Sequence, residues 1–353
     1  AVRQQYVNHE YQQDDIGEAV FHDPGKTNVE AFRDGLKLVR EAAGEKVFFL
    51  GCTVAQNMRS FGASFGLVNA MRVGEDNGPG WDSEKKDLLA GPRAASNRYF
   101  LNGRVWWNDP DPVYIRPSIP IEHARLISSW VGLTGMMMTY SEWLPDMPQE
   151  RVFILQRIMP NHGLKTRPID YFDSYIPKMW LLKDTSGSAE RYVLGLFNWD
   201  SENGADFRYD PVKAGLPKAR AYVGFDFWNN KFIAPFKEID FHAPKGDCLI
   251  IAVRPVSDRP QVISTNRHIT QGIVDLRNEK WTERTLSGES DIIGGERYEI
   301  RVIAPEGNKT RRLKKVTVGS PGVEASFEQD GPRIRVSLKS NTSAKVKWKM
   351  HFD

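Results

Sequence analysis

The hydrophobic pattern of the chain changes part-way along, and this change constrains the fold more than any other feature. As far as about residue 165, short apolar runs alternate with segments of helical period. Strands are predicted at 47–50, 68–72, 105–107 and 136–140, and helices at 28–43, 83–100, 121–133 and 149–158. Continuous apolar strands that alternate with helices predict a parallel sheet covered by helices.

The first predicted helix carries recognisable start and stop signals. Thr27 and Glu30 have the spacing of a capping box, and Gly44 supplies a stop. One face of this helix is apolar, with Val29, Phe32, Leu36 and Val39. The segment therefore predicts an amphipathic helix packed on the sheet.

Polar side chains follow the predicted strands. They are Cys52, Asp76, Asn108, Asp109, Ser141 and Glu142. A (β/α)8 barrel builds its active site at these strand ends, but a closed barrel needs eight strand–helix units and only about four are visible here. Half a barrel would leave open sheet edges. We therefore expect the C-terminal half of a TIM barrel, with the N-terminal half supplied by the same polypeptide or by a separate chain.

Beyond about residue 175 the apolar residues follow a period of two, which predicts antiparallel sheets. Ile334, Val336 and Leu338 alternate with polar residues, as do Val346, Trp348, Met350 and Phe352. The predicted fold is thus α/β plus all-β. Its predicted domains are 1–174, the partial barrel; 175–257, an antiparallel β-sandwich; and 258–353, a second β-rich domain.

Composition excludes several classes of function. The net charge is +3 and no Lys/Arg block stands out, so nucleic acid is not an expected partner. No apolar run is long enough to span a membrane. Two cysteines, Cys52 and Cys248, make neither a disulfide framework nor a zinc site.

The chain begins without Met or an apolar leader, so either a leader has been removed or the chain starts inside a longer polypeptide; a secreted or periplasmic location is preferred.

Aromatic side chains and strand-end acids indicate sugar chemistry. Ten Trp, eleven Tyr and eighteen Phe are many for such a chain, although most such rings lie in cores. The acids near predicted strand ends are Glu75, Asp76, Asp109, Asp111 and Glu142. Glycoside hydrolysis needs two carboxyl groups, one to protonate the leaving oxygen and one to attack or activate water. No nucleophilic-serine elbow, phosphate loop or helical His pair is present.

Specific sequence motifs then indicate which class of enzyme the chain resembles. Three segments carry them: Phe49-Leu50-Gly51-Cys52, Ala70-Met71-Arg72-Val73-Gly74-Glu75-Asp76 with Pro79-Gly80-Trp81, and Arg104-Val105-Trp106-Trp107-Asn108-Asp109-Pro110-Asp111 with Arg116 after it. Together with Asp23-Pro24 and Arg40-Glu41-Ala42, this stretch resembles the α-galactosidases of glycoside hydrolase family 36 and their clan D relatives. The resemblance covers roughly residues 20–165.

The resemblance implies a retaining exo-α-glycosidase that needs no cofactor and acts on an oligosaccharide or polysaccharide. Asp76 matches the family's catalytic acid/base. Arg72 matches the arginine that contacts sugar hydroxyls, and Cys52 matches a residue lining the subsite. Trp81 is expected in the same wall. Asp109 and Asp111 are expected to hold loops by accepting backbone hydrogen bonds.

One element of the family pattern is missing. The family's nucleophile is an Asp in a Lys-x-Asp motif on an earlier strand, and this chain has no such motif before Asp23. Glu10, Asp14 and Asp15 are the acids nearby, and none lies in an apolar strand context. We therefore expect the nucleophile to lie outside this chain or to be lost.

Two other functions remain open. An α-N-acetylgalactosaminidase, or another α-glycosidase of the same clan, would keep the fold and change the sugar. A non-catalytic carbohydrate-binding subunit derived from such an enzyme would explain the missing nucleophile.

Overall fold

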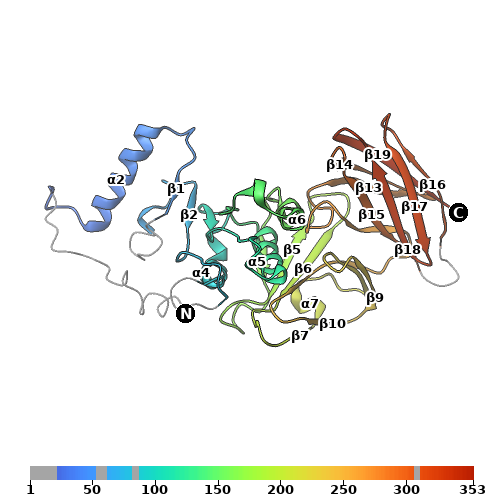
Figure 1. Cartoon of the computed structure of the whole chain (residues 1–353), viewed down its shortest axis with the longest axis horizontal. Coiled ribbons are helices and arrows are strands. Elements are labelled where there is room, and N and C mark those ends of the chain that lie inside the picture. Colours follow the sequence, from blue (N-terminus) through green and yellow to red (C-terminus); the bar gives the residue numbers. More distant parts are fainter. Residues whose placement is uncertain (1–21, 53–61, 82–86, 306–310) are drawn as a thin grey trace. The chain divides into compact units, whose positions relative to one another are not determined.

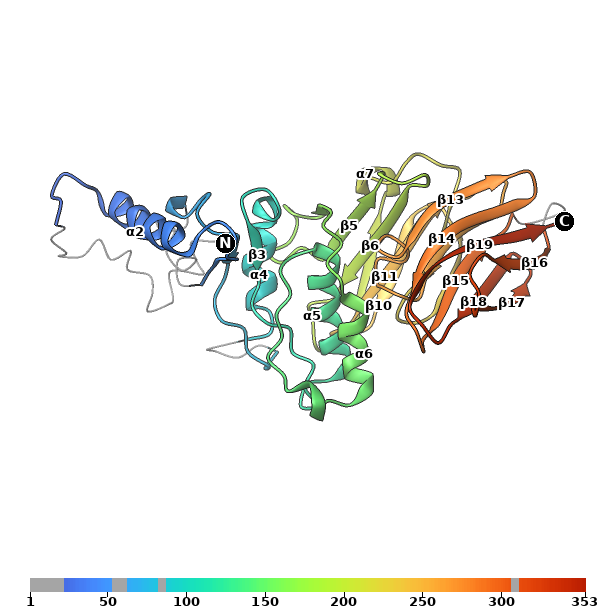
Figure 2. The same cartoon turned by 90° about the horizontal axis from the view of Figure 1, so that it is seen from above.

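The computed structural model describes residues 22–52, 62–81, 87–305 and 311–353, and Figures 1 and 2 show it from two directions. The chain divides into two compact units. One comprises Ala1–Val152 and Asp170–Pro177, and the other comprises Phe153–Ile169 and Lys178–Asp353. Among the described residues, no helix is long and apolar enough to cross a membrane.

The first unit contains a three-stranded parallel sheet. Its strands are β1 (Leu50–Gly51), β2 (Ala70–Arg72) and β3 (Trp107–Asp109), in that order. Leu50 pairs with Ala70, and Arg72 pairs with Asp109. The parallel pairing predicted from continuous apolar runs is confirmed for these three strands. The half barrel itself stays a prediction.

Helices accompany these strands in the chain. They are α2 (Asn28–Ala43), α4 (Ala90–Asn97), the 3-10 helix η3 (Tyr99–Leu101), α5 (Ile121–Thr134), the 3-10 helix η4 (Leu144–Asp146) and α6 (Gln149–Ile158). The predicted capping box is confirmed: the Thr27 hydroxyl accepts from the Glu30 amide at 3.3 Å, and the Glu30 carboxylate accepts from the Thr27 amide at 2.8 Å. Gly44 ends α2 with φ 81°, a conformation that a glycine adopts without strain.

Several predicted elements differ from the structure in extent. The strands expected at 47–50 and 105–107 are β1 (Leu50–Gly51) and β3 (Trp107–Asp109), each of which overlaps its prediction by one residue. The helix expected at 83–100 begins only at Ala90; residues 82–86 lie outside the described part. The strand expected at 136–140 is an isolated bridge between Val113 and Tyr140. The Met137 amide still donates to the Asn108 carbonyl at 2.8 Å. Pro110 and Pro112 have no N–H to donate, so a regular ladder cannot form along this segment.

The second unit begins with an antiparallel sheet of six strands. Their order is β4 (Thr166–Pro168), β5 (Met179–Asp184), β6 (Arg191–Phe197), β11 (Cys248–Pro255), β8 (Tyr222–Asp226) and β9 (Lys231–Phe236). A separate two-stranded antiparallel sheet pairs β7 (Ala205–Tyr209) with β10 (Ile239–Ala243). The short helix α7 (Pro211–Ala214) follows β7 in the chain. Leu194, Phe207 and Ile251 belong to one buried apolar cluster that these elements share.

Two four-stranded antiparallel sheets complete the second unit (Figures 1 and 2). One has the order β12 (Gln261–Thr265), β15 (Arg297–Ile303), β18 (Arg333–Lys339) and β17 (Glu324–Asp330). The other has the order β13 (Leu276–Thr282), β14 (Thr285–Ile292), β19 (Ala344–Phe352) and β16 (Leu313–Val318). The predicted alternation is confirmed, because Ile334, Val336 and Leu338 of β18 and the four apolar residues of β19 lie in one core.

A buried carboxylate links the six-stranded sheet to the pair of four-stranded sheets within the second unit. Glu279 of β13 accepts hydrogen bonds from Arg191 of β6 at 2.6 Å and from Arg254 of β11 at 2.8 Å. It also accepts from the Val262 amide at 3.1 Å. Although burial favours its protonated form, Arg254 and Arg191 hold the pKa of Glu279 below its usual value, so the side chain is ionised.

The core between the last two sheets leaves no room for a side chain at position 288, and this can be tested. Gly288 of β14 pairs with Trp348 of β19, and a Cβ at position 288 would lie 2.5 Å from the indole ring. The ring cannot swing away because Trp348 is 1% exposed. We expect Gly288→Ala to lower the free energy of unfolding by about 1–3 kcal/mol, measured by urea denaturation.

Gly319→Ala is the matched control, because the nearest atom to its Cβ would be 3.7 Å away. We expect this control to change the free energy of unfolding by less than about 0.5 kcal/mol. Equal losses in the two variants would show that the indole ring does not require glycine at position 288.

Candidate functional site

The candidate site is built on the carboxyl ends of β2 and β3. Arg72 is the last residue of β2 and lies in register with Asp109, the last residue of β3. Asp76 follows β2 by one short loop, and Asp111 follows β3. Because parallel strands end at the same edge of their sheet, these four charged side chains come together.

Arg72 forms ion pairs with all three carboxylates. Its Nη1 lies 2.9 Å from Asp76 Oδ1, its Nε lies 3.5 Å from Asp109 Oδ2, and its Nη2 contacts Asp111 Oδ1. Asp109 and Asp111 are nearly buried, whereas the Asp76 side chain is 52% exposed. Asp76 is therefore the carboxylate of this set that a ligand from solvent reaches.

Asn77 fixes the loop that carries Asp76. Its amide N–H donates to Asp111 Oδ2 at 2.6 Å, and its side-chain Nδ2 donates to the Pro110 carbonyl at 3.0 Å. Its Oδ1 accepts from the Gly91 amide at 2.7 Å. A Cβ at Gly91 would meet the Pro110 carbonyl at 2.5 Å, so this approach requires glycine. Sequence reasoning missed both residues, since their partners are distant in the sequence and belong to no periodic pattern.

The two buried aspartates have the structural contacts expected of them. Asp109 Oδ1 accepts from the Asp111 amide at 2.9 Å, and Asp111 accepts from the Asn77 amide. Asp111 also adopts φ 75°, in the left-handed region, where aspartate is among the more tolerant side chains. The hydrogen bonds of this turn thus hold both carboxylates against Arg72.

Burial and the shared cation set the charge states. Burial raises the pKa of Asp111 to about 6, although the Asn77 amide and Arg72 act in the opposite direction. Burial also disfavours the charge on Arg72, but Asp111 and Asp109 outweigh it and raise the pKa of the guanidinium. At neutral pH the guanidinium of Arg72 is therefore charged, and it faces Asp111, whose pKa of about 6 lies below that pH.

Cys52 and Trp81 differ in their relation to this cluster. Cys52 is exposed, and its thiol is close enough to Arg72 to contribute to the pKa of the guanidinium. Trp81 packs its ring against His123, with ring centroids 4.1 Å apart. The structure therefore relates Cys52 to Arg72 and gives Trp81 a partner that sequence reasoning did not identify.

The other candidate acids lie elsewhere or outside the described residues. Glu142 accepts from the Ile115 and Arg116 amides at 3.2 and 3.3 Å and pairs with the Arg116 guanidinium at 3.1 Å, which indicates a structural role. Glu10, Asp14 and Asp15 lie outside the described residues. Among the residues described, no group of three or more His, Cys, Asp or Glu side chains could hold a metal ion.

Comparison with known proteins relates this fold to glycoside hydrolases. No protein-family model matches the sequence. α-Galactosidase I from Mortierella vinacea superimposes with a TM-score of 0.52 at 10% identity, over 64% of this chain and 63% of its own. A putative α-galactosidase/melibiase from Bacteroides fragilis gives 0.51 at 12%, over 64% and 51%. A GH27 β-L-arabinopyranosidase from Geobacillus stearothermophilus, in complex with arabinose, gives 0.51 at 12%, over 64% and 55%.

These likenesses show a shared fold at low sequence identity. The chain spans less than two thirds of the length of each of these three proteins. The expected resemblance to clan D enzymes is therefore supported at the level of the fold, whereas membership of family 36 stays a prediction.

The charge balance of the cluster can be tested through Asp111. Arg72→Gln removes the cation that lowers the pKa of Asp111, so we expect that pKa to rise above its present value of about 6. Carboxyl ¹³C NMR of aspartate-labelled protein measures the titration, and Asp111→Asn assigns its signal. Arg116→Gln, which removes a cation paired with Glu142 instead, should leave the titration unchanged.

The same titration contributes to stability with a definite sign. The pKa of Asp111 is higher in the folded state than its ordinary value of 3.8, so the folded protein binds the extra proton. Its stabilising contribution is present below about pH 4 and is lost as the pH rises through about 6.

An Asp111 titration that is the same with and without Arg72 would contradict the proposed charge coupling.

Proposed function

We propose that this chain contributes the acid/base side of the active site of a retaining exo-α-glycosidase of α-galactosidase type. The observation that carries the proposal is the ion pair between Arg72 and Asp76 at the carboxyl end of β2. It holds an exposed carboxyl group beside a fixed cation, where a barrel enzyme would bind its substrate. The fold shared with two α-galactosidases and an arabinopyranosidase supports the same class of substrate.

In this proposal the carboxyl group of Asp76 protonates the glycosidic oxygen as the bond to the anomeric carbon breaks. A second carboxylate attacks that carbon and forms a covalent glycosyl-enzyme. Asp76, now ionised, takes a proton from water, which displaces the enzyme carboxylate and returns the original anomeric configuration. The two carboxyl groups would stand about 5–5.5 Å apart. We assign the second carboxylate to no described residue.

Asp109 and Asp111 would act by position in this scheme. Both are buried and bound to Arg72, and both are hydrogen-bonded within the turn after β3. They orient the guanidinium, which then presents Asp76 and its remaining N–H donors to sugar hydroxyls. Cys52 would line the same subsite, and Trp81 would form part of its wall.

The open edge of the parallel sheet supports the proposal that a further barrel segment is a partner of this chain. β1 is an edge strand in the described sheet. Close to it in the chain, Leu38, Val47 and Phe48 are 67%, 48% and 58% exposed. Unpaired strand edges and clustered exposed apolar side chains favour association with another chain segment. The N-terminal half of a barrel, from the same polypeptide or another, would cover both.

Asp76→Ala tests the catalytic assignment. The assay uses the longest natural polypeptide that contains this sequence, with phenyl and 2,4-dinitrophenyl α-galactosides. We expect kcat/KM for the phenyl substrate to fall by about 10²- to 10⁴-fold. We expect kcat/KM for the dinitrophenyl substrate to fall less, because its leaving group needs little protonation. Azide, which needs no general base, should restore turnover and yield α-galactosyl azide.

Asp173→Ala is the control, since it removes an exposed carboxylate from the same unit. An Asp76→Ala variant with unchanged turnover on both substrates would contradict the assignment. Nitrophenyl α-N-acetylgalactosaminide and α-glucoside, tested beside the galactoside, separate the sugars that this class of site could take.

Cys52 offers a test of binding that does not require turnover. Cys52 is exposed and Cys248 is buried, so iodoacetamide should modify Cys52 first. We expect galactose or a galactose-like inhibitor to slow modification of Cys52, measured by mass spectrometry, and glucose to protect less. Cys248 in the same sample reports any general change in accessibility.

This measurement also addresses the non-catalytic alternative. A chain that only binds sugar would show protection of Cys52 without turnover in the Asp76 assay. Absence of protection at saturating sugar would contradict a subsite at Cys52.

A further inference from the structure

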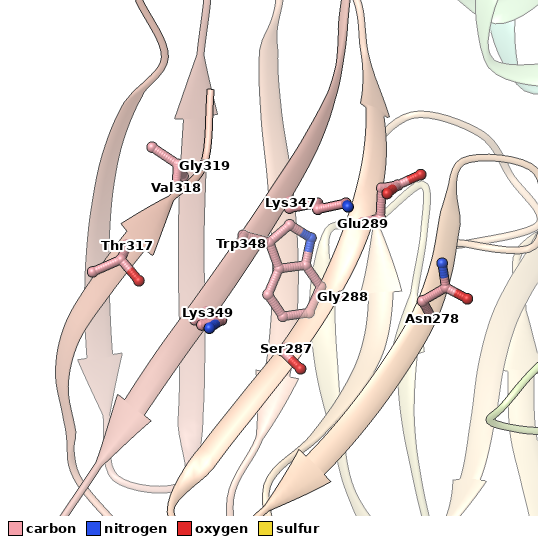
Figure 3. A pocket seen from close by; sticks show the side chains of 10 residues that line it. All are labelled: Asn278, Ser287, Gly288, Glu289, Thr317, Val318, Gly319, Lys347, Trp348 and Lys349. Carbon is pink, nitrogen blue, oxygen red and sulfur yellow. The ribbon is translucent and has the colours of Figure 1, made fainter. Parts of the chain in front are cut away.

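A groove lies on the sheet formed by β13, β14, β19 and β16. It has a volume of about 590 Å³ and is lined by Asn278, Ser287, Glu289, Thr317, Lys347 and Lys349, among others (Figure 3). This volume is within the range of small-molecule sites. Gly319 lies beside Lys347 and carries no side chain to fill this end of the groove. We call this feature the basic groove.

The polar face of β19 is a row of cations. Lys345, Lys347 and Lys349 are exposed and alternate with buried apolar residues, so all three lie on one face of the strand. Lys315 of β16 lies on the same face, since it pairs with His351, two residues beyond Lys349. Among the described residues, none of these four lysines forms an ion pair.

Few acids balance this row. Asp291 on the neighbouring strand β14 pairs with Arg277 at 2.5 Å. Glu289 is the cross-strand partner of Lys347, and the Lys347 side chain extends toward it in Figure 3. The face therefore carries an excess of positive charge, and Glu289 is the acid in the groove that opposes it.

The groove lacks an exposed aromatic platform. Trp348 is part of its lining, but the ring packs against Gly288 in the core and its Nε1 donates to Ser290 at 3.0 Å. The remaining polar contacts available to a ligand are ammonium groups, hydroxyl groups, an amide and the Glu289 carboxylate. Nucleobases bind such sheets largely by stacking on aromatic rings, and insertion into a membrane interface requires exposed apolar side chains.

We propose that the basic groove binds an acidic glycan segment, through its carboxylate or sulfate groups at Lys347 and Lys349. Sugar hydroxyls would hydrogen-bond to Ser287, Thr317 and Asn278. The groove belongs to the second unit and Asp76 to the first, and occupancy of the groove does not depend on the proposed hydrolytic activity. Charge complementarity and the neutral polar lining together favour a ligand that carries both anions and hydroxyl groups.

Isothermal titration calorimetry of the whole chain with defined oligosaccharides tests the proposal. Oligogalacturonides supply carboxylates, sulfated galactan oligosaccharides supply sulfates, and neutral galactan oligosaccharides of equal length are the reference. We expect at least one acidic ligand to bind, the neutral one not to bind, and added salt to weaken binding. The acidic ligand that binds more tightly identifies the anionic group.

Two variants locate the binding. Lys347→Gln with Lys349→Gln should lower the affinity by about tenfold or more, which corresponds to about 1.4 kcal/mol. Glu289→Gln removes the opposing carboxylate and should raise the affinity. Lys245→Gln with Lys339→Gln removes the same charge from exposed sites away from the groove and should change little. Far-UV circular dichroism checks that every variant is folded.

Three results would overturn the proposal. One is that no acidic oligosaccharide binds. Another is that both double variants lose affinity equally, which would indicate attraction to net charge alone. The third is that anionic vesicles or single-stranded DNA bind more tightly than the acidic glycans and depend on the same two lysines.

Discussion

The contact between Arg72 and its three carboxylates is the interaction on which the first unit depends most. Asp109 and Asp111 are nearly buried and lie two residues apart in one turn, so their charges would repel without a cation between them. Removing one partner from a buried ion pair typically costs about 3–5 kcal/mol. The same guanidinium holds Asp76 at the solvent side, so the stability of the strand ends and the placement of the candidate acid have one cause.

Much of the fold could be predicted from the spacing of apolar residues along the sequence. Continuous apolar runs predicted parallel strands at 68–72 and 105–107, and the structure has them at Ala70–Arg72 and, shifted by two residues, at Trp107–Asp109. Alternation predicted the buried faces of β18 and β19. The prediction of a strand at 136–140 was wrong. Pro110 and Pro112, on the segment beside it, lack the N–H donors that a ladder needs, and the apolar pattern of residues 136–140 carries no information about that neighbouring segment. The domain boundaries at 174 and 257 stay a prediction.

The candidate site was predictable to the extent that it follows a local motif. Arg72 and Asp76 are four residues apart, and the structure joins them by an ion pair. Asn77 and Gly91 were not predictable, since their roles arise from contacts with Pro110 and with each other after folding. The catalytic assignment of Asp76 and the subsite roles of Cys52 and Trp81 remain proposals.

The arginine pair around Glu279 has a consequence for how the second unit opens. Arg191 and Arg254 belong to the six-stranded sheet, whereas Glu279 belongs to the sheet pair that ends the chain. Separating these layers would expose an ionised carboxylate and two guanidinium groups that now satisfy one another. Partial opening of either layer therefore carries an electrostatic cost that couples the two layers, and local unfolding of one is favoured less while the other stays in place.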